Sequence, residues 1–282
     1  MTITHSAPAA GYERISVAPL TCAIGAEVEA VQLHELDEEA FAELRRAWLE
    51  HKVLFFRDQQ MSTAEHVAFG RRFGELEVHP FLPHVAEHPE VIIFESTADK
   101  PQAAESWHSD VSFRPTPSMG SILRSRVSPA VGGDTLWANM ERAYDDLPDS
   151  LKARIEGLSA VHTIRKTFAR GLSGEALEKA LAEHPDQVHP VVRTHPETGR
   201  RCIYVNRNFT SHVVGLEPEE SRELLRRLYE RASYPQHQCR FRWRADSVAL
   251  WDNRCTQHYA SPDFFPQHRR MERVTMVGDR PA

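Results

Sequence analysis

Two histidines and one aspartate of the sequence could together hold a metal ion. His108 and Asp110 stand two residues apart in the tetrapeptide WHSD. On an extended segment, residues i and i+2 project from the same face, so the imidazole and the carboxylate would point together. His258 lies 150 residues further on and follows the strand-like run SVALW, which suits a strand on the opposite side of a closed barrel.

The metal chemistry stays open at this point. A His-x-Asp pair recurs by chance as a hydrogen-bonded surface pair, so it needs the third ligand. Two histidines and a carboxylate on one face of the ion form the facial triad of non-haem Fe(II) oxygenases, which leaves positions for further ligands. Zinc enzymes that hydrolyse their substrates can use similar ligands.

Two arginines near the end of the sequence offer sites for anions. Arg269 comes eleven residues after His258, and Arg273 stands four residues later. Residues four apart share a face on a helix and approximately on a strand, so the spacing does not settle their directions. A guanidinium is a rigid fork that matches two oxygens of a carboxylate or sulfonate. A solvated basic patch is the ordinary alternative, but a neighbouring metal triad favours anion sites.

Short strands must position most of these residues. After Gly74, β-rich runs alternate with Pro, Gly and Asp turns, and few strands are followed directly by a helix. This pattern of short strands and turns predicts an antiparallel jelly roll, mainly β with helical decoration, and not a doubly wound sheet. We expect residues 1–12 to be a flexible tail and residues 13–282 to be one domain. The strand-like runs are VIIFES, MGSILRS, DTLWAN, QVHPVVRTH, CIYVNRNF, CRFRWRADSVALWDN and RVTMVGD.

Helical periodicity marks a few segments around these strands. Residues 37–52 repeat apolar side chains on one face, and Ser62 with Glu65 forms a capping-box pattern that opens a second helix. Further helices are predicted at residues 140–158, 174–183 and 217–233. We expect the helical His51, His66 and His184 to be solvated, and the strand-borne His162, His189 and His195 to pack in the core.

Composition excludes several classes of protein. The chain of 282 residues carries 34 Lys and Arg against 40 Asp and Glu, with a formal net charge of −6. We therefore expect no global basic field for nucleic acid and no anionic-membrane binding. We find no apolar run near 20 residues and no signal-like start, which favours a cytoplasmic protein. The four cysteines are scattered and are interpreted as reduced, packed thiols.

The motifs in combination resemble the taurine dioxygenase family of Fe(II)- and 2-oxoglutarate-dependent oxygenases. The resemblance extends from about Ile15 to the end of the chain and rests on His-x-Asp, the distal His and the Arg eleven residues later. It implies a double-stranded β-helix, which agrees with the jelly-roll prediction. The matching segments are WHSDVSF, GGDTLWAN, HPVVRTHPETG, YVNRNFT and WDNRCTQHYASPDFFPQHRRMERVTMVGD.

The resemblance also implies roles for individual residues. His108, Asp110 and His258 would be the iron ligands. Arg269 would hold the distal carboxylate of 2-oxoglutarate, with Thr135 adding a hydroxyl hydrogen bond. The residues implied for the second substrate are Arg273 and His79 at its anionic head, Phe168 and Phe209 as an apolar wall, and the backbone of Val111 near its other end.

The implied reaction is hydroxylation of a small organosulfonate such as taurine at the carbon bearing sulfur. With O2 and 2-oxoglutarate it releases sulfite and an aldehyde together with succinate and CO2. Two departures put taurine in doubt, because Leu82 and Ala104 stand where the taurine-specific enzymes have a Tyr and an Asn. A longer alkyl sulfonate or a sulfate ester becomes competitive.

Two rival functions remain on the same scaffold. One is an aryloxyalkanoate dioxygenase, although we would not expect the equivalent of His79 there. The other is a jelly roll that binds a metal without catalysis, although such a protein has no need of a carboxylate clamp beside an open triad. The expected partners are a small anionic substrate and further copies of the chain in a homo-oligomer, with neither nucleic acid nor membrane.

Overall fold

The computed structural model describes residues 11–101 and 106–282. Nearly all of the tail expected at residues 1–12 lies outside these residues, and so does Ala104.

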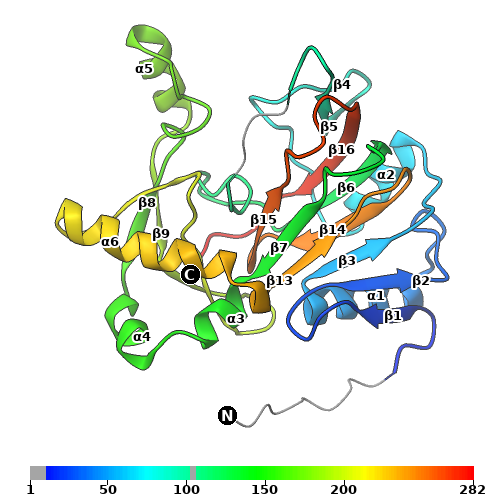
Figure 1. Ribbon diagram of the computed structural model, residues 1–282, viewed down its shortest axis with the longest axis horizontal. Coiled ribbons are helices and arrows are strands. Elements are labelled where there is room, and N and C mark those ends of the chain that lie inside the picture. The colour runs from blue at the N-terminus through cyan, green and yellow to red at the C-terminus, as the bar shows by residue number, and fades with distance from the viewer. Residues whose placement is uncertain (1–10, 102–105) are drawn as a thin grey trace.

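An eight-stranded sheet forms the larger half of the molecule (Figure 1). Neighbouring strands are antiparallel except for β2 and β3, which run parallel. In spatial order the strands are β1 (Ser16–Pro19), β2 (Ala26–Glu29), β3 (Val53–Phe56), β14 (Val248–Asp252), β6 (Gly120–Val127), β16 (Arg269–Met276), β5 (His88–Ser96) and β4 (His84–Val85).

A three-stranded sheet packs against the eight-stranded sheet, and the two form a sandwich. Its strands are β13 (Gln238–Phe241), β7 (Thr135–Asn139) and β15 (Thr256–Ala260). Trp137 of β7 packs at 5.2 Å from Phe55 and at 5.7 Å from Trp251, both on the large sheet, between ring centroids. The core between the two sheets is therefore aromatic, and the mainly β jelly-roll prediction is confirmed.

The central strands are buried on both faces. Because side chains alternate along a strand, Val53 and Phe55 of β3 enter the core between the sheets, whereas Leu54 and Phe56 enter a second core. This second core lies under the helices α1 (Glu38–His51) and α2 (Thr63–Arg71). Two-sided burial explains why the run VLFF is apolar throughout.

The helix at α2 begins as the sequence predicts. The Ser62 hydroxyl accepts a hydrogen bond from the Glu65 backbone, and the Glu65 carboxylate accepts one from the Ser62 backbone. The solvated position expected for His66 is wrong, because this side chain is fully buried and its Nε2 lies 3.2 Å from the Ile122 carbonyl. Burial lowers the pKa of His66 to about 3.

The remaining elements form the part of the molecule that holds α6 (Pro218–Tyr229) and α5 (Gly174–Glu183) (Figure 1). The predicted single helix at residues 140–158 is wrong: it is divided into α3 (Met140–Asp145) and α4 (Asp149–Ile155), because Pro148 cannot continue a helix. The other elements are β8 (Ser159–His162), β9 (Gln187–Pro190), β10 (Val192–Thr194), β11 (Arg201–Ile203), β12 (Thr210–Val213) and the 3-10 turns Glu230–Ser233 and Pro235–His237.

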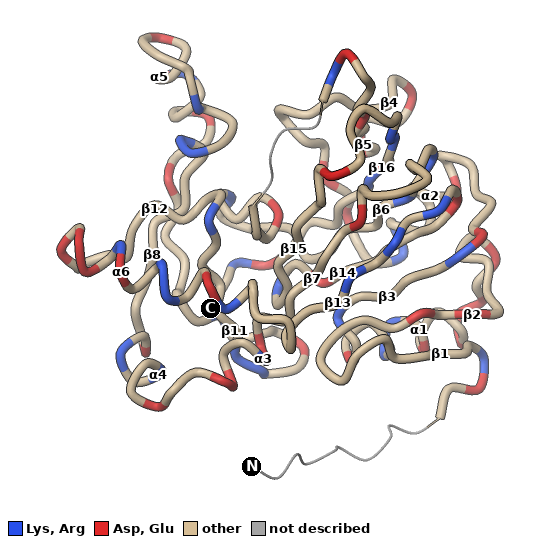
Figure 2. Tube along the Cα trace, in the orientation of Figure 1, with Lys and Arg blue, Asp and Glu red and all other residues tan. Residues whose placement is uncertain are grey.

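Charged residues of both signs are distributed over the described chain. Blue Lys and Arg positions alternate with red Asp and Glu positions along the described chain (Figure 2). Among the described residues, no helix has the length and apolar composition required to cross a membrane.

Candidate active site

The two histidines of the candidate triad are paired directly through their backbones. The His258 amide donates to the His108 carbonyl at 2.8 Å, and the His108 amide donates to the His258 carbonyl at 3.2 Å. The expected placement of His258 on the opposite side of the barrel is therefore wrong. His108 forms an isolated bridge to β15, and Asp110 lies in a turn instead of on the expected extended segment.

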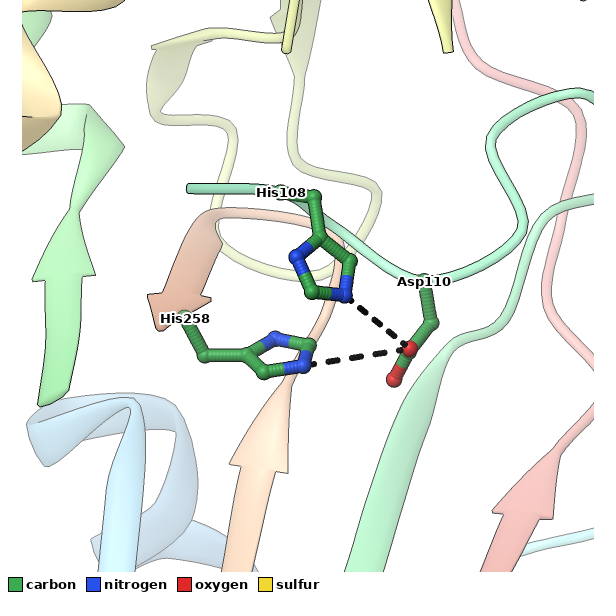
Figure 3. Close-up of side chains that lie close together, drawn as sticks. All are labelled: His108, Asp110 and His258. Carbon is green, nitrogen blue, oxygen red and sulfur yellow. Dashed lines mark ion pairs between the residues drawn. The ribbon is translucent and has the colours of Figure 1, made fainter. Parts of the chain in front are cut away.

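The three side chains nevertheless converge on one point (Figure 3). The Asp110 Oδ1 atom lies 4.0 Å from His108 Nε2 and 3.9 Å from His258 Nε2. All three candidate ligand atoms lie within 4.8 Å of one another. A divalent cation bonded to nitrogen and oxygen at about 2.1 Å fits between atoms that are about 4 Å apart. The donor set therefore fits a metal ion of the Fe(II) class.

The protonation of the histidines also fits metal binding. The Nδ1 of His108 lies 2.7 Å from the Ser106 carbonyl, which can only accept, so Nδ1 carries the proton and Nε2 keeps its lone pair. Burial lowers the pKa of His258 to about 3 and keeps it neutral. A neutral imidazole is the form that binds metal.

Asp110 is ionised although it is buried. Burial alone would raise its pKa, but the neighbouring Arg273 guanidinium, with smaller contributions from the two histidines and the Ser121 hydroxyl, holds the pKa of this carboxyl below its usual range. Arg273 Nη1 donates to Oδ1 at 2.8 Å, and the Ser121 hydroxyl donates to Oδ2 at 3.0 Å. The candidate metal carboxylate is thus fixed at both oxygens.

The two arginines predicted to bind anions lie on β16 and face the same way. Met271 packs in the core between the sheets, and the alternation of side chains along a strand puts Arg269 and Arg273 on the same face as Met271. They line a pocket of about 390 Å³ that His108 and His258 also line. The sequence left the side-chain directions of Arg269 and Arg273 open, and their positions on β16 settle them.

Thr135 lines the same pocket at the start of β7. Its hydroxyl oxygen accepts a hydrogen bond from Trp243 Nε1 at 2.9 Å, so its own proton is free to be donated into the pocket. The preceding Gly133 has a φ of +71°, and a Cβ there would lie 3.3 Å from Cδ of Arg269. Because Gly133 has no side chain, the GGDT segment can pass close beside Arg269.

His79 contributes a neutral hydrogen-bond donor. Burial and the nearby charge of Arg273 lower its pKa to about 3. Its Nδ1 accepts from the Phe81 amide at 3.2 Å, which places the proton on Nε2. An anion beside Arg273 could therefore receive a hydrogen bond from His79, but not a second positive charge.

The other predicted substrate residues lie in an aromatic cluster beside the pocket. Phe168 stacks on Phe81 with 4.7 Å between ring centroids and lies 5.3 Å from the His79 ring. Phe209 lies 6.4 Å from the His108 ring. Val111 belongs to the same apolar cluster. The cluster joins His79 to the metal ligands, and none of these residues lines the 390 Å³ pocket itself.

Several residues of the site were missed by the sequence analysis. The pocket wall includes Ile93, Phe94 and Trp251, while Ser121 and Trp243 hold predicted residues in place. Ile93 and Phe94 belong to no recognisable sequence motif, and their sequence indicates only an ordinary strand. Ser121 shares a face of β6 with Leu123, but nothing in the sequence of this strand indicates its contact with Asp110.

A second group of potential metal ligands has a different role. His195, Asp252 and Cys255 are buried within ligand distance of one another. Arg254 Nε and Nη2 donate to the two oxygens of Asp252 at 2.9 and 2.7 Å, and His195 Nε2 lies 3.0 Å from Oδ2. Because the carboxylate is already fully bonded beside a guanidinium, this cluster stabilises the turn after β14.

Comparison with known proteins assigns the chain to a family that agrees with the residues of the candidate site. Residues 16–275 match the profile of the family described as taurine catabolism dioxygenase TauD, TfdA. The chain belongs to this family of dioxygenases. It is accordingly a 2-oxoglutarate-dependent dioxygenase, as the resemblance of its motifs predicts.

Relatives within this dioxygenase family differ in their substrates. The chain is 38% identical to an alkylsulfatase of Acinetobacter baylyi, over 95% of this chain and 86% of the relative. It is 34% identical to an (S)-phenoxypropionate/alpha-ketoglutarate-dioxygenase of Sphingobium herbicidovorans, over 93% and 95% of the two chains. The crystal structure of a taurine dioxygenase from Burkholderia xenovorans superposes with a TM-score of 0.83 at 39% identity, over 96% of this chain and 91% of that one.

Proposed function

We propose that this dioxygenase uses Fe(II) and 2-oxoglutarate to hydroxylate a small alkyl sulfonate or alkyl sulfate ester at the carbon that bears the sulfur-containing group. His108, Asp110 and His258 would hold the iron. When bound, iron and 2-oxoglutarate together supply the oxidation of a C–H bond by O2, with release of succinate and CO2. The hydroxylated carbon then loses sulfite, or sulfate from an ester, and becomes an aldehyde.

Two buried cations on one face of β16 carry the proposal. Arg269 and Arg273 are 5% and 6% exposed, and four residues of strand place their Cα atoms about 13 Å apart. One anion can therefore bind at each arginine without sharing it. We assign Arg269, beside Thr135, to the distal carboxylate of 2-oxoglutarate, and Arg273, beside Asp110, to the anionic head of the substrate.

His79 and its aromatic neighbours would complete the substrate end. A neutral Nε2–H from His79 and the guanidinium of Arg273 would donate to different oxygens of a tetrahedral sulfonate or sulfate group. Phe168 and Phe209 would shield the anion from water and strengthen these hydrogen bonds. The backbone of Val111 would lie near the other end of the substrate.

The apolar wall favours an alkyl chain over the ammonium group of taurine. Leu82, Pro83, Ile93 and Phe94 line the pocket that contains Arg273. These four side chains offer a charged ammonium group no hydrogen bond in exchange for its hydration, whereas an alkyl chain would gain about 0.8 kcal/mol for each buried CH2 group. The substitution at Ala104, outside the described residues, supported the same preference from the sequence.

A substrate panel tests the proposal. With Fe(II), ascorbate and 2-oxoglutarate supplied, we expect succinate to form with pentanesulfonate or pentyl sulfate, with equimolar sulfite or sulfate, and more slowly with taurine. Turnover of a phenoxypropionate in their place would assign the protein to the aryloxyalkanoate branch, in which Arg273 would bind a carboxylate. Failure to consume 2-oxoglutarate with every compound, despite bound iron, would support a binding protein.

A further inference from the structure

The carboxylate of Asp110 is held differently at its two oxygens. Oδ1 faces both candidate histidine ligands and receives a hydrogen bond from Arg273. Oδ2 is turned toward the large sheet, where the hydroxyl of Ser121 on β6 lies 3.0 Å away. A carboxylate can bind a metal through one oxygen or through both, so the contact at Oδ2 affects which of these is possible.

The direction of the Ser121 hydrogen bond is fixed by its other neighbours. Asn253 Nδ2 donates to the Ser121 oxygen at 3.0 Å, and Thr275 Oγ1 lies 3.4 Å from it. Asn253 Oδ1 accepts from Trp251 Nε1 at 2.9 Å, which settles which end of the amide is the nitrogen. Because the serine oxygen accepts from Asn253, its single proton is left for Asp110.

The same asparagine also holds the backbone of the ligand turn. The Asp110 amide donates to Asn253 Oδ1 at 3.3 Å. The next residue, Val111, has a φ of +41°, which a β-branched residue adopts only when its surroundings impose it. Asn253 thus contacts both the main chain of Asp110 and, through Ser121, its side chain. Ser121 and Asn253 are fully buried, so water does not compete for these bonds.

We infer that Ser121 and Asn253 are positioning residues that hold Oδ2 of Asp110 toward β6 and thereby present Oδ1 to the two histidines as the oxygen that would bind the metal. This inference rests on the proposed function only in taking the triad as the metal site. Neither residue touches the substrate. Their effect passes through Asp110, and partners of this kind typically change metal affinity by about 10- to 100-fold when they are removed.

The test is metal binding by the full chain with Co(II) as the spectroscopic probe. Ser121→Ala removes the hydroxyl with little change in volume, and we expect its Co(II) dissociation constant to rise by about 10-fold or more. We also expect its d–d absorption bands to change in position or intensity, because Oδ2 is no longer held toward β6. Metal-free unfolding temperatures show whether the fold is retained.

Ser125→Ala is the matched control, because Ser125 is a buried serine on the same strand whose hydroxyl bonds to Ser128 instead. It should bind Co(II) as the unmodified protein does, with the same spectrum. Equal affinity and equal spectra in Ser121→Ala would overturn the inference and leave the proposed function intact. Absence of Co(II) binding by the unmodified protein would overturn the metal site, and the inference with it.

Discussion

Replacement of Arg269 by alanine tests how the two anion sites are divided. Arg269 is almost completely buried and lines the pocket beside Thr135. It lies on the same face of β16 as Met271, two residues further on, and Arg273, four residues further on. If it holds the distal carboxylate of 2-oxoglutarate, Arg269→Ala removes the charged partner of that group only. We therefore expect a large effect on 2-oxoglutarate and a small one on the substrate.

The magnitude follows from the geometry of the guanidinium. A bidentate contact comprises two charge-assisted hydrogen bonds, each worth about 1.5 kcal/mol at the lower end of the measured range. Loss of both corresponds to about 3 kcal/mol, or a rise of roughly 100-fold in the 2-oxoglutarate concentration for half-saturation. Arg269→Lys keeps the positive charge but lacks the planar guanidinium that can donate two parallel hydrogen bonds. We therefore expect the 2-oxoglutarate concentration for half-saturation to rise by about 10-fold in this variant.

The assay is succinate formation at varied 2-oxoglutarate and then at varied pentanesulfonate. Arg270→Ala is the matched control, because Arg270 neighbours Arg269 on β16 but points to the opposite face, where it pairs with Glu95 and Glu272 at 3.7 Å. It should leave both half-saturation values within about threefold, because Arg270 does not line the pocket.

One result would refute this division of roles. If Arg269→Ala raised the requirement for sulfonate while leaving that for 2-oxoglutarate unchanged, the two arginines would have exchanged functions. Arg273→Ala should then show the reverse pattern.

Four further predictions follow from other residues. His108→Ala should abolish succinate formation and weaken Co(II) binding; full turnover would exclude the triad. Trp243→Phe removes the donor that orients Thr135 and should raise the 2-oxoglutarate requirement about fivefold, or about 1 kcal/mol, in the same assay; an unchanged requirement would show that the hydroxyl needs no orientation. Leu82→Tyr should raise the taurine-to-pentanesulfonate ratio of kcat/KM about 10-fold, and no change would remove Leu82 as a reason to doubt taurine. His66 has a pKa of about 3 in the folded protein, whereas the unfolded chain takes up a proton at this residue near pH 6.5. The contribution of His66 to the free energy of unfolding is therefore complete above pH 6.5 and should fall by about 1.4 kcal/mol per pH unit between pH 6.5 and 3. Urea titrations of His66→Gln should show an acid dependence that is shallower by this amount, and a slope identical to that of the unmodified protein would contradict this account.

The sequence predicted elements best where local signals agreed. The capping box at Ser62 located the start of α2, and the helices predicted at residues 37–52 and 174–183 agree within a residue or two with α1 and α5. The helix predicted through Pro148 failed because its apolar spacing was followed across a residue that cannot continue a helix. His66 was misjudged because its charged neighbours face solvent while its own side chain faces the sheet.

Residue types and spacing determined the chemistry available to this protein. Two histidines, an aspartate and two arginines in this order predicted a metal centre with anion sites, since imidazole and carboxylate groups bind divalent metals and guanidinium groups bind anions. Tertiary structure decided how they meet. The backbone pairing of His108 with His258 joins segments 150 residues apart. The strand β16 gives Arg269 and Arg273 a common face, and the packing of β6 brings Ser121 to Asp110. Strand register and burial, which depend on the whole sheet, set these contacts.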